Sequence, residues 1–314
     1  MDSIIRFENI SKKFGKNQVL NNLNLSIKEK DIFGVIGLSG SGKTTILNLL
    51  IGFLNTNSGK IYFQSKDVTK NKKQVLNEFG FATQTGSFYN RLTVRENLYF
   101  FGRLYKLPKK ELKERITELI KLVELQGTEN KLTRQLSTGM KRRLDIACAL
   151  ITDPTVLILD EPTQDLDPFL RKQILALIRK INTETGTTIV ITSHLLGEIE
   201  EICTDIAILH NGQIIESGSP NLIRENYSIK ENKHEEIHFS TSPGDYNRIL
   251  SNLPQAEISH ISSKPNKVTV YTSNTEAVLY NVINAIRASN EKLINLDVNK
   301  PTLEEVFESL TKRQ

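Results

Sequence analysis

The chain contains stretches with two different patterns of hydrophobic residues. Residues 4–10, 18–27 and 60–64 alternate apolar and polar side chains, as strands with one buried face do. From residue 31 onward the pattern changes to short apolar runs, each followed by a loop or a helix: "DIFGVIG", "FGFATQ", "TVLILDE" and "TTIVITS". Continuous apolar strands that are interspersed with helices predict a parallel sheet covered on both faces.

A helical region and a hairpin are predicted in the same part of the chain. The segment that follows Pro108 repeats apolar side chains at the spacing of one helix face: Leu112, Ile116, Leu119, Ile120 and Val123. The stretch "ILHNGQIIESG" predicts a hairpin that turns at Asn211-Gly212. We therefore predict an α/β domain with a helical subdomain at about residues 90–150.

The last third of the chain follows a different pattern. Residues 225–236 are polar and charged, which predicts a linker. Strand-like and helix-like segments beyond it follow the order β-α-β-β-α-β, which is typical of a small ferredoxin-like α+β domain, and a helix follows Pro301. Because 314 residues are more than one ordinary core usually holds, we expect two domains, residues 1–224 and 237–314.

Composition and charge narrow the class of protein. With 38% hydrophobic and 25% charged residues, the chain has a globular rather than a disordered composition. The net charge of +5 comes from interspersed basic and acidic residues, so no nucleic-acid partner is expected. Cys148 and Cys203 lie in apolar contexts without metal-ligand spacing, which predicts buried thiols and no disulfide. No signal peptide and no run of about 18 apolar residues is found, so we expect a cytoplasmic protein without a membrane span.

A glycine-rich loop carries the clearest chemical signal. "GLSGSGKTT" lies directly after a predicted strand and before a predicted helix, and satisfies G-x-x-x-x-G-K-[ST] in that context. Backbone N–H groups of such a loop surround phosphate oxygens, and the helix N-terminus favours negative charge. Lys43 is predicted to reach the β- and γ-phosphates, and the Thr44 hydroxyl to bind Mg²⁺. The predicted nucleotide-binding residues here are Gly37, Leu38, Ser39, Gly40, Ser41, Gly42, Lys43, Thr44 and Thr45.

Other predicted strands end in polar side chains. "VLILDEPT" ends a buried strand in Asp160, which suits Mg²⁺ coordination, and Glu161, which can polarise an attacking water. An acidic strand end exposed to solvent is the alternative. His194 ends "TTIVITSH" and Gln84 ends "FGFATQ". Since parallel sheets place their sites at the carboxyl ends of strands, both are candidates, although a structural histidine and an ordinary loop glutamine are also possible.

These motifs, taken in order, carry a family resemblance. "GLSGSGKT", Gln84, "LSTGM" at residues 136–140, "VLILDEPT" and His194 together resemble the ATP-binding cassette (ABC) ATPases over about residues 3–224. The resemblance implies a P-loop NTPase fold, in which a mixed sheet carries an antiparallel β subdomain and a helical subdomain. It also implies an ATPase that binds ATP and Mg²⁺ and pairs head to tail with a second copy or a paralogous cassette.

The resemblance also implies roles for individual residues. "LSTGM" is similar to the family's signature loop, in which Ser137 and Gly139 contact the ATP on the other copy's P-loop. Asp167 matches the D-loop carboxylate, and Phe14 lies where the family places an aromatic ring on adenine, a core residue being the alternative. Glu161, His194 and Gln84 are implied as catalytic, and Thr44, Gln84 and Asp160 as magnesium ligands. The sequence departs from the family pattern at three positions. Thr138 replaces the first signature glycine and Met140 replaces the glutamine. Asp165 stands where a glycine commonly precedes the D-loop leucine, and this change puts the D-loop geometry in question.

The class of ABC protein is predicted from what surrounds these motifs. One P-loop and no long coiled-coil insertion favour a transporter subunit over the nucleic-acid members. "RLTVRENLYFFGRLY", "LSTGM" and "PTLEEVFESLTKR" are similar to ATPases of drug, antibiotic and polysaccharide exporters. An importer ATPase and a soluble regulatory or nucleic-acid-associated ATPase are the alternatives.

Integral membrane permease subunits are the expected partners, and they would hold the protein at the inner face of the cell membrane. The expected docking surface is an apolar cluster, part of which could be core: Phe88, Tyr89, Leu98, Tyr99, Phe100 and Phe101. The basic run Lys141-Arg142-Arg143 predicts either a solvated helix face or an attraction to anionic lipid.

Overall fold

The chain is divided into two units, Met1–Pro220 and Asn221–Gln314, in the computed structural model. The structure describes residues 3–71, 75–231, 235–254, 257–264, 267–272, 274–299 and 302–312. The division lies at Pro220, slightly earlier than the boundary at residue 224 that the composition predicts.

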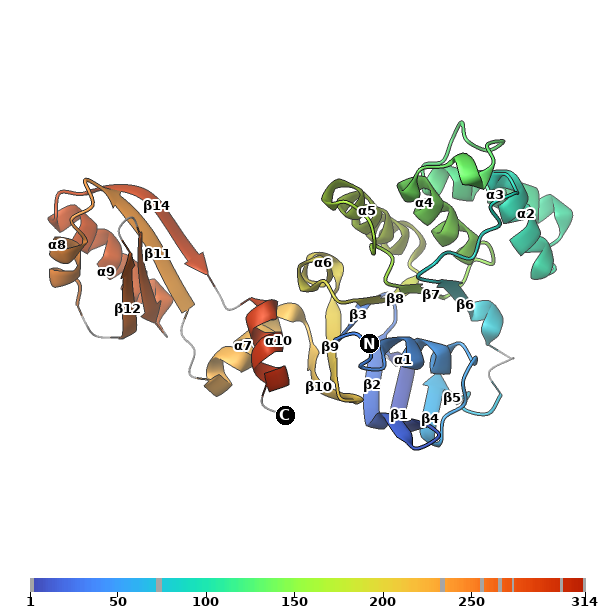
Figure 1. Ribbon diagram of the computed structural model, residues 1–314, viewed down its shortest axis with the longest axis horizontal. Helices are drawn as coiled ribbons and strands as arrows, with labels where there is room; N and C mark the ends of the chain where they lie inside the picture. Colours follow the sequence, from blue (N-terminus) through green and yellow to red (C-terminus); the bar gives the residue numbers. More distant parts are fainter. Residues whose placement is uncertain are drawn as a thin grey trace. The chain divides into compact units, whose positions relative to one another are not determined.

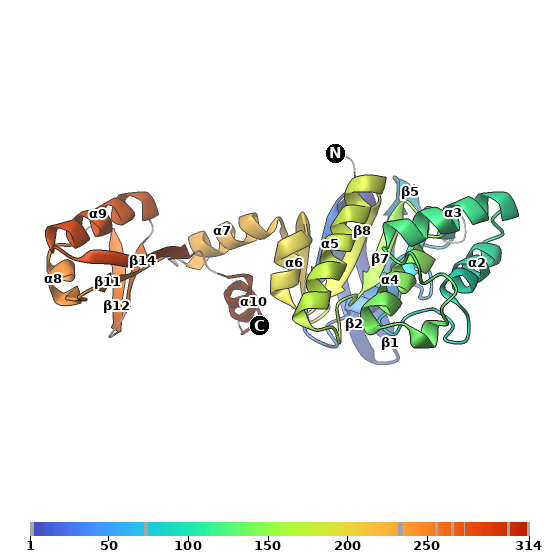
Figure 2. The same ribbon diagram turned by 90° about the horizontal axis from the view of Figure 1, so that it is seen from above.

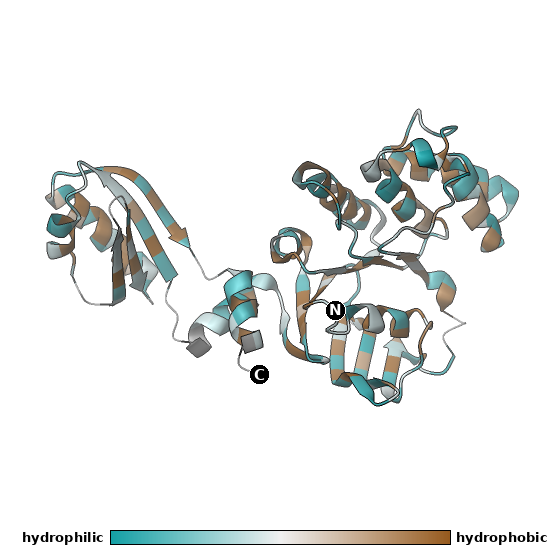
Figure 3. Ribbon diagram, viewed as in Figure 1, coloured by the Kyte–Doolittle hydropathy of each residue, from teal (hydrophilic) through white to brown (hydrophobic). Residues whose placement is uncertain are grey.

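The first unit begins with an antiparallel sheet in the strand order β2-β1-β4-β5 (Figure 1). Its strands are β1 (Ser3–Phe14), β2 (Asn17–Lys28), β4 (Ser58–Phe63) and β5 (Lys66–Asp67). Hydrophobic and polar residues alternate along these strands in Figure 3, and the apolar ones, such as Ile5 and Phe7, are buried. The alternation in the sequence therefore corresponds to one face in the core and one in solvent.

A second, mixed sheet has the strand order β10-β9-β3-β8-β7-β6. Its pairs are parallel from β9 to β6, and β10 is antiparallel to β9. The strands are β3 (Ile32–Ile36), β6 (Phe79–Ala82), β7 (Val156–Asp160), β8 (Thr188–Ser193), β9 (Asp205–His210) and β10 (Gln213–Gly218). This arrangement brings the carboxyl ends of β3, β6, β7 and β8 to one edge, where the predicted site residues follow.

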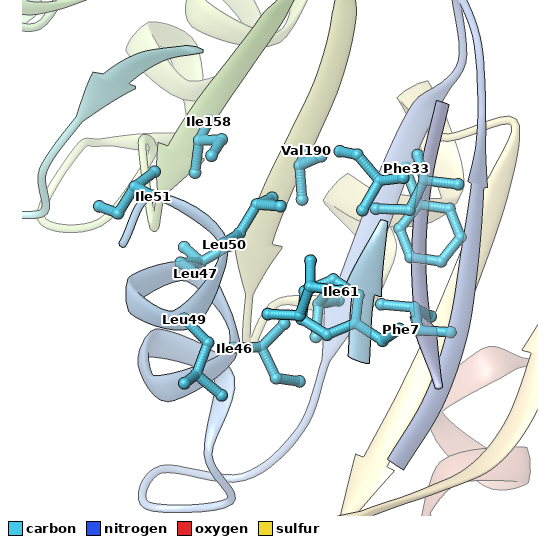
Figure 4. Packing of buried hydrophobic residues seen from close by; sticks show 14 of the residues in the cluster. Phe7, Phe33, Ile46, Leu47, Leu49, Leu50, Ile51, Ile61, Ile158 and Val190 are labelled. Atoms are coloured by element: carbon cyan, nitrogen blue, oxygen red, sulfur yellow. The ribbon is translucent and has the colours of Figure 1, made fainter. Parts of the chain in front are cut away.

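Helices cover both faces of the mixed sheet. Helix α1 (Lys43–Leu50) lies on one face, and α5 (Pro168–Thr185) and α6 (Leu196–Ile202) lie on the other (Figures 1 and 2). Side chains of α1, such as Ile46 and Leu50, share a buried cluster with Phe7 of one sheet and Val190 of the other (Figure 4). Each such side chain contributes about 1.5–3 kcal/mol of transfer free energy, so the start of α1 is held firmly against both sheets.

Three helices between β6 and β7 form the predicted helical subdomain: α2 (Val94–Leu104), α3 (Lys109–Leu122) and α4 (Thr138–Ala149). Short 3-10 helices occupy Leu76–Glu78 and Thr133–Gln135. Thr93 and Glu96 form a capping box at the start of α2. The helix-spaced apolar side chains of α3 are all buried, as their periodicity predicts: Leu112, Ile116, Leu119 and Ile120.

The second unit begins with a helix where the composition predicts a linker. Helix α7 spans Pro220–Glu231, so the linker prediction is wrong for residues 225–231. Residues 232–234 lie outside the described part of the chain, and residues 235 and 236 already belong to a strand. Ile223 and Tyr227 are buried and stand four residues apart, on one side of a helix. Two buried positions among polar ones give too weak a periodicity to predict this helix.

A four-stranded antiparallel sheet follows, in the order β12-β13-β11-β14. Its elements, in chain order, are β11 (Glu235–Ser242), α8 (Tyr246–Ser251), β12 (Ile258–Lys264), β13 (Lys267–Thr272), α9 (Thr275–Ala288) and β14 (Lys292–Asn299). Helix α10 (Leu303–Lys312) follows. The core of this sheet joins Phe239 and Val270 of the strands to Ile249 and Val282 of the helices.

Two expected properties can be compared with the structure directly. Cys148 and Cys203 are free and buried, as predicted. Among the helices that the structure describes, none combines the length and the apolar character needed to cross a membrane.

Candidate active site

The glycine-rich loop connects β3 to α1, as predicted. Gly42 has a left-handed backbone with φ of 112°, and a Cβ there would lie 2.8 Å from Leu20 Cδ2. A Cβ on Gly37 would lie 2.4 Å from Ser41 Oγ and 2.6 Å from the Leu209 carbonyl oxygen. These two positions therefore require glycine, because the loop closes tightly on itself and on the neighbouring strands.

Lys43 is the first residue of α1, and its side chain is buried in the loop. Its Nζ donates to the carbonyl oxygens of Gly37 at 2.7 Å and Leu38 at 3.3 Å. Burial lowers the pKa of Lys43, although the carboxylates of Glu161 and Asp160 oppose this shift. Beside it, the Ser41 hydroxyl is buried and has no hydrogen-bond partner in the described part of the chain. Buried hydroxyls are normally satisfied, so this loop fits a ligand with acceptor oxygens such as a phosphate.

Asp160, at the end of β7, is tied to the loop and to β8. Its Oδ2 accepts from Thr44 Oγ1 at 3.2 Å, and its Oδ1 accepts from Thr192 Oγ1 at 2.6 Å. Carboxylate and hydroxyl oxygens are the ligands that Mg²⁺ prefers, so Thr44 and Asp160 fit this ion. Thr192 is a fully buried polar residue that the sequence analysis missed. A threonine inside the apolar run "TTIVITS" is the signal that could have indicated it.

Glu161 follows directly but has a different backbone conformation. Its φ of 47° is left-handed, which is uncommon outside glycine and occurs where the surrounding structure enforces it. Its N–H donates to Thr192 Oγ1 at 3.0 Å. Its Oε1 lies 3.7 Å from Lys43 Nζ, and its Oε2 lies 3.1 Å from His194 Nδ1. The structure therefore brings Lys43, at the start of α1, together with Glu161 and His194, which follow the ends of β7 and β8.

Gln84, which the resemblance implies as a magnesium ligand, is bonded to a neighbouring loop in this structure. Its Nε2 donates to Oε1 of Gln164, in the segment after Glu161. Thr44 and Asp160 are in contact with each other, whereas Gln84 is bonded to a neighbouring loop. Gln164 is therefore an amide partner of Gln84 that the sequence analysis did not consider, and the magnesium role of Gln84 stays a prediction.

The D-loop, "DLDP" at residues 165–168, accommodates aspartate at its first position. Asp165 has a φ of 61°, in the left-handed region that glycine favours and aspartate tolerates. Asp167 caps α5, because its Oδ1 accepts from the backbone N–H groups of Phe169 at 2.9 Å and Leu170 at 3.0 Å. Asp165 therefore preserves the turn, and Asp167 holds the start of the next helix.

The left-handed backbone at Asp165 predicts how substitutions there change stability. Asp165→Val is expected to lower the free energy of unfolding by about 1–2 kcal/mol, since a β-branched residue is strained at this φ. Asp165→Gly, the matched variant, is expected to be at least as stable as Asp165→Ala. Urea unfolding of the three variants measures the effect. Equal stability of the valine and glycine variants would contradict it.

The signature loop begins α4. Ser137 is the N-cap, and its Oγ accepts from the Met140 backbone N–H at 3.3 Å. Thr138 is already helical, so its replacement of glycine needs no special backbone conformation. A Cβ on Gly139 would lie 3.0 Å from Leu170 Cδ2 of α5, so glycine allows close packing there. Ser137 and Gly139 thus belong to the helical subdomain, not to the loop around Lys43.

Phe14, predicted to stack on adenine, is not among the residues that line the cavity beside the glycine-rich loop. Phe14 ends β1 with 47% of its surface exposed, and Lys12 Nζ lies 5.0 Å from its ring centroid. A cavity of about 350 Å³ beside the glycine-rich loop is lined by residues 17–19, 38–41 and 210–212. The start of β2 therefore forms its wall together with His210, which the sequence analysis did not single out.

Half of the predicted apolar docking cluster is exposed, and Phe88 and Phe101 are half-buried. Leu98 is fully buried and belongs to the core, which corrects its inclusion. The rings of Tyr89, Tyr99 and Phe100 are exposed. The centroids of Tyr89 and Phe100 are 4.8 Å apart, and Phe101 lies 5.7 Å from Phe100. The helical subdomain thus carries an exposed aromatic cluster.

The basic run after the signature loop is not a solvated face. The side chains of Arg142 and Arg143 are each only 11% exposed. Arg142 donates to the carbonyl oxygens of Thr83 and Gln84, and Arg143 donates to that of Val123. The prediction of a solvated or lipid-facing run is therefore wrong for both arginines, whose long side chains reach inward to backbone carbonyls.

Together, a phosphate-binding loop, a magnesium-type oxygen pair and a glutamate beside a histidine define a P-loop ATPase with an inserted helical subdomain. A model of the family described as ABC transporter matches residues 20–164. The bacitracin transport ATP-binding protein BcrA of Bacillus licheniformis is 38% identical over 216 residues, or 69% of this chain and 70% of BcrA. The linearmycin resistance ATP-binding protein LnrL of Bacillus subtilis is 30% identical over 312 residues, or 99% of each chain. Methionine import ATP-binding protein MetN 1 of Bacillus thuringiensis is 37% identical over 223 residues, or 68% of this chain and 66% of MetN 1.

The solved structures that resemble this chain are also ABC transporter cassettes. The cbiO1 protein of Clostridium perfringens, described as part of the ABC transporter complex cbiONQ, has a TM-score of 0.68 and 27% identity, covering 74% of this chain and 94% of its own. A dimeric ATP-binding cassette bound to ADP and Pi has a TM-score of 0.61 and 28% identity, covering 68% of this chain and 98% of its own. The chain belongs to the ABC transporter ATPases. It is an ATP-binding subunit that uses Mg²⁺ and hydrolyses ATP, and cassettes of this family dimerise and pair with permease subunits.

Proposed function

We propose that this ATPase drives export through separate membrane subunits. The observation that carries the proposal is the similarity to LnrL over 99% of both chains, because it includes the second unit as well as the cassette. LnrL is named for resistance and BcrA for bacitracin transport. The similarity to the importer subunit MetN 1 covers 68% of this chain. The protein would lie at the inner face of the membrane, held there by its permease.

The second unit lies within the stretch of similarity to LnrL, and we propose that it is an accessory domain. We assign it to the ferredoxin-like class, because its element order is β-α-β-β-α-β and its sheet order is β12-β13-β11-β14. In this order β11 lies between β13 and β14, and β13 lies between β12 and β11.

The proposed catalytic cycle combines the contacts of the site with the roles that the family resemblance implies. Two copies, or this chain and a paralogous cassette, enclose two ATP molecules head to tail. Lys43 and the N–H groups of the loop at residues 37–42 bind the phosphates, and Ser137 and Gly139 contact the ATP of the other copy. Thr44 and Asp160 would hold Mg²⁺, which neutralises charge on the transferred phosphoryl group. In this proposal Phe14 stacks on adenine, and Asp167 orients the D-loop at the dimer interface.

Glu161 is the general base in this proposal. Its carboxylate pairs with Lys43 at 3.7 Å and with His194 at 3.1 Å. A bound γ-phosphate competes for Lys43, which frees one carboxylate oxygen of Glu161 to accept a proton from water. His194 holds the other oxygen, and Gln84 contacts the magnesium ion and the γ-phosphate from the adjoining loop. Closure of the dimer then exerts force on permease helices docked at the aromatic cluster around Tyr89 and Phe100.

The test uses the chain together with its membrane subunits in a bacitracin-sensitive host. We expect a higher inhibitory concentration of bacitracin or linearmycin and less labelled antibiotic in the cells. Phe100→Glu should abolish both effects and co-purification with the permease, since a charge in the docking surface opposes a desolvated contact. Tyr280→Glu, on an exposed ring of the second unit, is the matched control and should be neutral. Energy-dependent accumulation of a solute would instead identify an importer.

A further inference from the structure

Two side chains of α4 are hydrogen-bonded to the loop that carries Gln84. We call residues 83–87 the Gln84 loop. Arg142 donates from Nη1 to the Thr83 carbonyl oxygen and from Nη2 to that of Gln84, both at 3.0 Å. Asp145, one turn further along α4, accepts from the Ser87 backbone N–H at 2.7 Å. Three backbone groups of the loop are thus fixed to one helix, and the planar guanidinium suits the two adjacent carbonyls.

The burial of this pair argues against a purely stabilising role. The Asp145 side chain is fully buried, and its Oδ2 lies 3.6 Å from Arg142 Nη1. Burial raises the pKa of Asp145 to about 6 and also lowers the pKa of Arg142. Among the described residues, Asp145 Oδ2 has no hydrogen-bond partner. Buried ion pairs with incomplete hydrogen bonding add little to stability, so what this pair supplies is a fixed geometry.

That geometry connects two parts of the site. Helix α4 begins at the signature residues, with Ser137 as its N-cap. The Gln84 side chain bonds to Gln164, which precedes the D-loop. We propose that Arg142 and Asp145 are positioning residues that make the Gln84 loop and α4 move as one body, so that Gln84 and Ser137 change position together. The role of Ser137 in this statement rests on the proposed dimer.

The neighbouring arginine is a matched control. Arg143 follows Arg142 on α4 and is equally buried. It donates to the Val123 carbonyl oxygen at 3.1 Å and to Glu124 Oε2 at 2.8 Å, and so connects α4 to the end of α3. Its removal perturbs the same helix without releasing the contacts to Thr83 and Gln84.

The test is a double-mutant cycle on the ATPase activity of the full chain. Gln84→Ala, Arg142→Ala and Arg143→Ala are made singly, and each arginine variant is combined with Gln84→Ala. We expect each single variant to lower kcat. The loss of kcat in the Gln84→Ala/Arg142→Ala double variant should be smaller than the product of the two single losses by about 3- to 30-fold, as for residues in one network. The Arg143→Ala and Gln84→Ala effects should multiply. Multiplication for the Arg142 pair, or a Gln84→Ala variant with normal kcat, would overturn the proposal.

Arg142→Lys keeps the cycle informative if Arg142→Ala does not fold. Lysine retains a charge beside Asp145 but cannot bridge two carbonyls in one plane. The same overlap with Gln84→Ala is expected, and multiplication would again overturn the proposal. ATP-driven dimerisation, measured separately in the Glu161→Gln variant, tests the proposed dimer. Its failure beside an intact Arg142 overlap would reject the proposed dimer but not the link to the Gln84 loop.

Discussion

Replacing Glu161 with glutamine is expected to lower ATP turnover by about 10²- to 10⁴-fold while ATP remains bound. Glutamine has nearly the same shape but cannot take a proton from water. It also removes the carboxylate that lies 3.7 Å from Lys43 Nζ, so the ammonium stays available to phosphate. Steady-state phosphate release measures the turnover, and calorimetric titration with Mg-ATP measures binding.

A second glutamate serves as a control, because its replacement removes the same charge without removing the proposed general base. Glu184, near the end of α5, is exposed. Glu184→Gln removes the same charge and is expected to leave both turnover and binding unchanged. Near wild-type turnover of Glu161→Gln would identify a different base. Loss of ATP binding would instead give Glu161 a role in holding the loop.

The sequence motifs predict the cassette well because their chemistry depends on neighbours in the chain. The spacing from Gly37 to Thr44 defines both the loop and the start of α1, since glycine conformation and helix polarity act over a few residues. The polar ends of the apolar strands are likewise local, and a parallel sheet brings them to one edge. Lys43, Asp160, Glu161 and His194 therefore meet as predicted, although what each does there remains a proposal.

Contacts between segments that are far apart in the chain could not be predicted from the sequence. Gln84 pairs with Gln164, 80 residues later, and Arg142 reaches carbonyls 58 and 59 residues earlier. Neither residue type nor spacing indicates such pairs, because a glutamine or arginine has many possible partners. Helix α7 was missed for a related reason: its buried face has few apolar residues and depends on packing within the folded unit.

The signature loop gives the second large expected effect. Ser137→Asp is expected to weaken ATP-driven dimerisation by about 100-fold or more, and to lower hydrolysis accordingly. In the proposed dimer its carboxylate would face the γ-phosphate held by the other copy, and such like-charge contacts cost several kcal/mol. Each copy should still bind ATP, because Lys43 and the glycine-rich loop belong to a different element. Sedimentation in the Glu161→Gln background, with Mg-ATP present, measures the association.

The control removes folding as an explanation. Aspartate and asparagine cap helices about as well as serine, so Ser137→Asp and Ser137→Asn should both keep the bond from the Met140 N–H and the melting temperature. Only the aspartate adds charge, and so only Ser137→Asp should lose dimerisation, while Ser137→Asn stays within a few-fold of the native chain. If both variants dimerise alike, Ser137 faces no phosphate and serves α4 alone. If neither dimerises, the hydroxyl itself makes the contact, and its geometry rather than its charge holds the second copy.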